Sequence, residues 1–183
     1  MHLRISMLLT IVMLPLAGCV TDSVSSSTGR ALPPEPREAQ PAPDAAPINA
    51  VAVLKSQRPI DTNGNGFPNR LGVAVYLFSR PYPSPRHADG SLRFRYYPIG
   101  SVDPVLGASA EPLATWTFTP DVLQAAKTDD IIGPGYALAL DISAIGMSTL
   151  DVEAADLVVD FLPGDGGAPT SCTTVQRIPF VIY

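Results

Sequence analysis

Oxygen-bearing side chains stand at alternate positions in the first half of the stretch DTNGNGFPN, which runs from Asp61 to Asn69. Asp61, Asn63 and Asn65 alternate with other residues, and two glycines lie among them. Carboxylate, amide and backbone carbonyl oxygens are the ligands that calcium takes, and a glycine allows the sharp bend of a calcium loop. Asn-Gly pairs are equally typical of tight turns between strands, because they tolerate positive φ. We favour the turn and keep the calcium site as the alternative.

The spacing is similar to the calcium loops of EF-hands, dockerins and thrombospondin type 3 repeats. In an EF-hand, side-chain oxygens at positions 1, 3 and 5 bind the ion, and position 7 offers its backbone carbonyl. The resemblance implies five ligands: Asp61, Asn63, Asn65, Phe67 and Asn69. The pattern departs from these families where Gly72 replaces the closing glutamate, and Asn69 stands where the thrombospondin pattern has a carboxylate. A single carboxylate predicts weak binding, on the order of millimolar. No other cofactor is expected.

Nucleophilic chemistry has few candidates in this chain. His87 is the only histidine beyond the first two residues, and it lies in the proline-rich stretch PYPSPRHADG. Ser84 and Asp89 are too near to it in sequence to give the convergent geometry of a hydrolase triad. Cys172 has no His or Lys near it in sequence, which predicts a packed small residue. We therefore expect no enzyme, and an envelope hydrolase that uses His87 is the third alternative.

The first nineteen residues have the pattern of a signal sequence. Ile5 to Leu16 run almost wholly apolar, which suits a signal sequence but is too short to cross a bilayer. Leu16-Ala17-Gly18-Cys19 resembles the lipobox, in which the cysteine thiol receives a diacylglyceryl group before cleavage. The resemblance implies that residues 1–18 are the signal peptide and that Cys19 is the lipidation site, holding the protein to membrane lipid by acyl chains such as palmitate. Val20, and not Asp, directly follows Cys19, so the family pattern favours the outer membrane in an organism that has one.

Residues 19–50 follow the leader and are rich in Ser, Pro and Ala, which predicts a disordered tether after the lipidated cysteine. The order of lipobox, tether and β-domain is similar to that of type VI secretion lipoproteins, whose transthyretin-like domain holds a membrane-core protein in the periplasm. This resemblance covers the order of features alone and carries over no functional residue.

Residues 51–183 read as one domain, an all-β antiparallel two-sheet sandwich that is Ig-like or transthyretin-like. Period-two alternation marks its strands: LGVAVYLF, SLRFRYY, ATWTFT, GYALALDI and QRIPFVIY, with ADLVVDFL as a mostly apolar strand. One short helix is predicted near residues 120–127, with Thr119 as N-cap and Pro120 at its first position. Pro179 predicts an edge position for the last strand.

Charge is uneven along the chain, whose net charge is -5. The segment from Lys55 to Arg95 contains seven basic and two acidic residues. The segment from Glu111 to Asp165 contains ten acidic residues and one basic residue, Lys127. Negative net charge and an envelope location argue against nucleic acid as a partner. We expect a lipid-anchored cell-envelope module that binds or assembles a protein partner. The alternative is a calcium-dependent carbohydrate or surface-binding module, for which Trp116, Tyr96 and Tyr97 are the candidate stacking aromatics.

Overall fold

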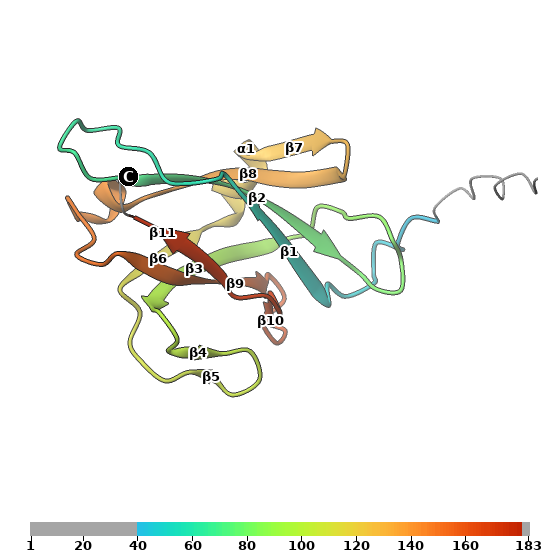
Figure 1. Cartoon of the computed structure of the whole chain (residues 1–183). Coiled ribbons are helices and arrows are strands. Elements are labelled where there is room, and N and C mark those ends of the chain that lie inside the picture. The colour runs from blue at the N-terminus through green and yellow to red at the C-terminus, as the bar shows by residue number, and fades with distance from the viewer. Residues whose placement is uncertain (1–39, 181–183) are drawn as a thin grey trace, which may run out of the picture. The chain divides into compact units, whose positions relative to one another are not determined.

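The computed structural model describes residues 40–180, which form two antiparallel β-sheets packed face to face (Figure 1). Sheet 1 has the strand order β1-β2-β8-β7, with the bounds β1 Ala50–Lys55, β2 Arg70–Phe78, β8 Gly133–Asp141 and β7 Lys127–Asp130. Sheet 2 has the order β10-β9-β3-β6, with the bounds β10 Thr170–Ser171, β9 Ala154–Pro163, β3 Gly90–Pro98 and β6 Ala114–Phe118. Strand β11 (Gln176–Pro179) also pairs with β9, and β4 (Val102–Asp103) and β5 (Gly107–Ala108) form a separate hairpin. The predicted all-β two-sheet sandwich is confirmed.

The core lies between the sheets, where the predicted alternation places it. In β2, the four residues that alternate from Leu71 to Leu77 are buried and face sheet 2. In β3, Leu92, Phe94 and Tyr96 are buried in the same core, while the arginines between them point outward. Side chains alternate between the two faces of a strand, so each sheet carries one apolar face inward. Burial of these apolar side chains supplies the main favourable free energy of folding.

The predicted helix is present but shorter than expected. Helix α1 spans Pro120–Ala125, with Thr119 as its N-cap residue and Pro120 in its first turn. Lys127, expected in the last helical turn, instead begins β7. The helix stops because the carbonyl of Ala126 accepts a hydrogen bond from the backbone N–H of Ala137 in β8. A 3₁₀ helix, η1 (Ile142–Ile145), was not predicted. Residues 40–180 contain no helix that is long and apolar enough to cross a membrane.

The ordered domain begins earlier than the predicted boundary at residue 51. Ala50 is already the first residue of β1, and the six residues before it, Asp44–Asn49, lie on the domain as a strap. Arg86 holds the strap by donating to the carbonyl oxygens of Asp44, at 3.0 Å, and Ala46. The Asn49 side chain bonds both the N–H and the carbonyl of Arg80. The predicted tether of residues 19–50 therefore includes a segment that packs, while its lipidation site at Cys19 lies outside the described residues.

Candidate functional site

The predicted calcium loop joins β1 to β2 and is built by hydrogen bonds from its own backbone. One carboxylate oxygen of Asp61 accepts from the N–H groups of Asn63 and Gly64, at 3.1 and 2.8 Å, and the other accepts from that of Gly66 at 2.8 Å. The amide oxygen of Asn65 accepts from the N–H of Phe67 at 2.8 Å, and its amide nitrogen donates to the carbonyl of Ser148. These are consecutive Asx turns, the arrangement that the turn interpretation requires.

Asn69, the last of the five predicted ligands, fastens the loop to the sandwich. Its side chain is buried, and its amide oxygen accepts from both the N–H and the hydroxyl of Thr62, at 2.8 and 3.0 Å. Its amide nitrogen donates to the Ser143 hydroxyl in η1. Gly64 and Gly66 have φ values of 73° and 84°, as the turn interpretation predicts. Within residues 40–180, no group of three or more His, Cys, Asp or Glu side chains is arranged to hold a metal ion.

The loop leads to a first prediction: calcium should leave the melting temperature of the wild-type chain unchanged. The Asp61 oxygens already accept N–H groups, and hydrogen bonds from Gly66 first, then from Gly64 and Asn63, lower the pKa of this carboxyl. The stabilisation that Asp61 gives is therefore present above the ordinary aspartate pKa and is lost only as the pH falls through the lowered value. Gly64→Ala should cost about 1 kcal/mol of unfolding free energy, because its φ is positive.

The measurement is thermal melting with millimolar calcium against a chelator, with magnesium as the control ion. A melting temperature that rises and saturates with calcium, and an effect that disappears in Asp61→Ala, would instead establish the calcium loop.

The other predicted chemical residues are held in structural roles. The Nε2 atom of His87 lies 2.9 Å from the Gly135 carbonyl oxygen, and its ring packs edge-on against Tyr136 with centroids 5.1 Å apart. No serine, threonine or cysteine side chain among residues 40–180 hydrogen-bonds to His87. The Cys172 thiol contacts the Thr174 carbonyl at 3.5 Å, and its side chain packs against the core. No described arrangement supports the hydrolase alternative.

The aromatic residues suggested for glycan stacking are not available for it. Trp116 and Tyr96 are buried in the core, where their rings meet edge to face with centroids 5.0 Å apart. Tyr97 lies on the outer face of sheet 2, but it is also buried, and its hydroxyl accepts from Arg95 at 2.7 Å. An exposed platform of these rings would favour the glycan-binding alternative, and the structure buries all three.

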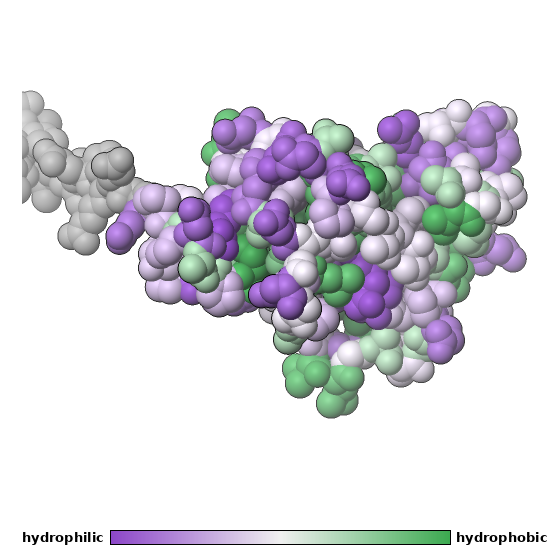
Figure 2. All heavy atoms as spheres, turned by 180° about the vertical axis from the view of Figure 1, so that it is seen from behind, coloured by the Kyte–Doolittle hydropathy of each residue, from purple (hydrophilic) through white to green (hydrophobic). Residues whose placement is uncertain are grey.

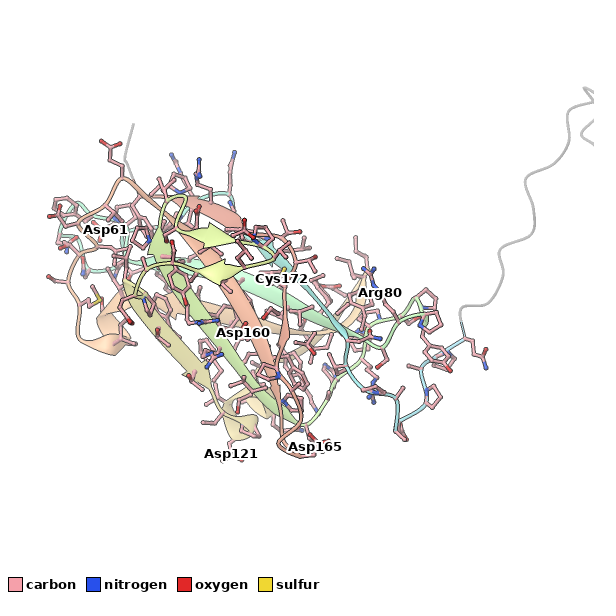
Figure 3. All side chains as sticks on the ribbon, turned by 90° about the horizontal axis from the view of Figure 1, so that it is seen from below. Asp61, Arg80, Asp121, Asp160, Asp165 and Cys172 are labelled. Atoms are coloured by element: carbon pink, nitrogen blue, oxygen red, sulfur yellow. The ribbon has the colours of Figure 1, made fainter. Side chains whose placement is uncertain are left out.

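Charged side chains on the outer face of sheet 2 form a tight network around Asp160 (Figure 3). Asp160 is 1% exposed, and one of its carboxylate oxygens accepts from Arg93 at 2.9 and 3.0 Å and from Arg95 at 2.7 Å. The other oxygen accepts from the Ser171 hydroxyl at 2.7 Å. The strand register explains this contact, because Arg93 in β3 lies directly opposite Asp160 in β9. The network joins three strands of sheet 2 and has a structural role.

A cleft of about 1270 Å³ lies at the strap. The strap forms one wall, and the segments around His87, the start of α1 and the turn after β9 form the others. Arg86 and His87 line this cleft, but both side chains are engaged by backbone carbonyls. The other charged residues of the lining are of both signs, Asp44, Asp89 and Asp165 against Lys127. The cleft has no paired nucleophile and base.

The hairpin β4–β5 presents two exposed apolar side chains, Val105 and Leu106, which we call the knob. They are 90% and 88% exposed, whereas most large apolar residues of the domain are buried. Figure 2 shows apolar atoms protruding at the bottom of the molecule, where Figure 1 places this hairpin. One Asp103 oxygen accepts from the N–H of both knob residues, at 2.7 and 2.8 Å. Two β4–β5 residue pairs complete the hairpin, so the knob has a defined backbone.

A second apolar surface lies on the outer face of sheet 1, where a groove of about 700 Å³ runs beside α1. Its floor consists of small residues that alternate with core residues, namely Gly72 in β2 and Ala137 and Ala139 in β8. Ile60 and Val122 are exposed apolar residues that line it. Two arginines, Arg58 and Arg70, line it as well, and its twelve lining residues include no acid. We call this surface the α1 groove.

Sequence reasoning did not single out the knob or the α1 groove. The knob is signalled by DPVLG, where two bulky apolar residues stand between turn residues, a context in which apolar side chains have no core to face. The groove has no comparable signal, because its residues come from four separate segments. Comparisons of the chain with protein-family models, curated proteins and solved structures found no match.

Proposed function

We propose that this chain is a lipid-anchored module of the cell envelope that binds a protein partner through the knob. In a diderm organism, the proposed location is the outer membrane. Val105 and Leu106 carry the proposal, because each exposes almost its whole side chain at the tip of a hairpin that hydrogen bonds hold in shape. Covering an exposed apolar side chain contributes about 1.5–3 kcal/mol. A preformed tip also loses little conformational entropy on binding.

The anchor part of the proposal rests on Leu16-Ala17-Gly18-Cys19 and the apolar run before it. Two or three acyl chains on Cys19 make stable attachment, where one chain alone is marginal. The resemblance to type VI secretion lipoproteins stays a prediction about the kind of assembly, since no family model supports it. The calcium-dependent surface-binding alternative keeps only the Asp61 loop, because its aromatic platform is buried.

The test replaces both knob residues by serine in the full-length chain of its source organism. Gently solubilised membranes are then separated by native electrophoresis. The wild-type chain should migrate in a complex larger than the monomer, and Val105→Ser/Leu106→Ser should shift most of it to monomer size. The fold should not change, because both side chains lie outside the core.

The matched control is Ile131→Ser/Ile132→Ser, at the exposed tip of the β7–β8 hairpin, which should leave the complex intact. Labelled palmitate should enter the wild-type chain and not Cys19→Ser. A wild-type chain that migrates as a monomer would refute the binding proposal, and label that still enters Cys19→Ser would refute the anchor.

A further inference from the structure

We infer that the partner of the knob is a second copy of this chain, whose α1 groove receives Val105 and Leu106. The inference rests on the proposed function and names the occupant of that same surface. The chain itself carries both halves of the contact, a convex apolar tip and a concave apolar groove.

The two surfaces cannot meet within one molecule. The groove floor is the outer face of sheet 1, because Gly72 and Ala139 alternate with the core residues Leu71 and Leu140. The hairpin β4–β5 lies on the other side of the sandwich, beyond sheet 2, as Figure 1 shows. The sandwich core separates the knob from the groove of its own chain, so the knob can fill only the groove of another copy.

Size and preorganisation fit this contact. The groove volume of about 700 Å³ accommodates the two branched side chains of the knob, and its glycine and alanine floor lets them approach the sheet closely. Ile60 and Val122, exposed in the single chain, would be covered. The knob is already ordered by the two hydrogen bonds to Asp103, so binding does not need to organise the hairpin.

Charge favours the same pairing. The only charged residues from Pro98 to Leu113, the segment that contains the hairpin, are Asp103 and Glu111. Arg58 and Arg70 line the groove, and neither has a carboxylate within salt-bridge distance among residues 40–180. An acidic hairpin approaching a basic groove is attracted, and opposite potentials select this docking over others.

A knob that fills the groove of the next molecule makes a head-to-tail contact. Such heterologous contacts build rings when the rotation closes and open chains when it does not. Two apolar side chains make a weak contact in dilute solution, but confinement on a membrane raises the effective concentration of both halves. The contact therefore suits assembly of anchored copies side by side.

The experiment places a photo-cross-linking amino acid at position 106 of the full-length chain in cells of the source organism. After irradiation, mass spectrometry identifies the residues joined to it. The expected adduct joins position 106 to the groove of a second copy, in the segments 56–72 or 122–139. Gly72→Asp should reduce its yield at least tenfold, because the added carboxylate occupies the groove floor and repels the acidic hairpin. The same cross-linker at position 131, an equally exposed apolar tip, should not label the groove.

The outcomes separate the two proposals. An adduct with a different protein, or with a self-peptide away from the groove, would overturn this inference and leave the proposed binding function standing. Adducts with lipid only, or none with protein, would overturn both. A groove adduct that Gly72→Asp leaves at full yield would also overturn the inference, since the groove would then not select the knob.

Discussion

Asp160→Asn should lower the free energy of unfolding by about 3 kcal/mol, one of the two largest effects that we expect from a single substitution in this domain. Asp160 is 1% exposed and is the only carboxylate within salt-bridge distance of Arg93 and Arg95 among residues 40–180. Removing one member of a buried ion pair typically costs 3–5 kcal/mol, because the remaining charge is left uncompensated. We place the effect near the lower end, because both guanidinium groups retain some contact with water. Urea denaturation of the purified chain measures it.

Asp156→Asn is the matched control, because it makes the same change on the same strand and the same outer face. Asp156 accepts from the Gly100 N–H at 2.7 Å and lies 3.4 Å from Arg177, whose side chain is mostly exposed. An asparagine oxygen can still accept the Gly100 N–H, so this change should cost about 1 kcal/mol. If both variants lose the same free energy of unfolding, the contact of Asp160 with two arginines contributes no more than the contacts of Asp156.

Gly90→Ala should be at least as damaging, with a loss of about 3 kcal/mol or more. Gly90 begins β3 with a φ of 154°, and a Cβ atom there would lie 2.4 Å from the Leu162 carbonyl oxygen and 2.7 Å from the Phe161 ring. Neither neighbour can move freely, because both lie in β9, which pairs with β3 along nine residue pairs. Overpacking of this kind costs 1–3 kcal/mol or more, and the glycine-favoured backbone adds to it. Thermal melting and urea denaturation report the loss.

Gly100→Ala separates the collision from the backbone preference. Gly100 has a φ of 75°, and a Cβ atom there would meet nothing within 4 Å. It should therefore cost only about 1 kcal/mol, the usual penalty of a positive φ. If Gly90→Ala is as stable as Gly100→Ala, then β9 can shift to accommodate the added Cβ atom, and the predicted collision does not occur.

The sequence predicted the long strands because their period-two alternation reflects burial directly. Alternate apolar residues of β2 and β3 share one face of each strand, and the structure buries those residues in the core. The four short strands β4, β5, β7 and β10 were missed, since two to four residues are too few for any period to appear. Helix α1 was found from its Thr-Pro start, but its end was misplaced because a tertiary contact with β8 stops it.

The sites were harder to predict than the strands, for a physical reason. The turn between β1 and β2 was recognisable, because Asn-Gly pairs act locally on their own backbone. The groove depends on residues from β2, β8, α1 and the loop before Ile60, which only the fold brings together. The strap was hidden by its composition, because its main contacts are backbone carbonyls held by Arg86, and no apolar side-chain pattern records them.

That strap also determines how the domain responds to tension. Under the proposed attachment at Cys19, a pull on the chain reaches the hydrogen bonds of Arg86 and Asn49 before it reaches β1. These few bonds, several of them open to solvent, would rupture while the ladder of six residue pairs between β1 and β2 remains whole. Releasing the six residues Asp44–Asn49 would extend the chain by about 20 Å. Under that attachment, release of the strap would lengthen the linker before the sandwich begins to unfold.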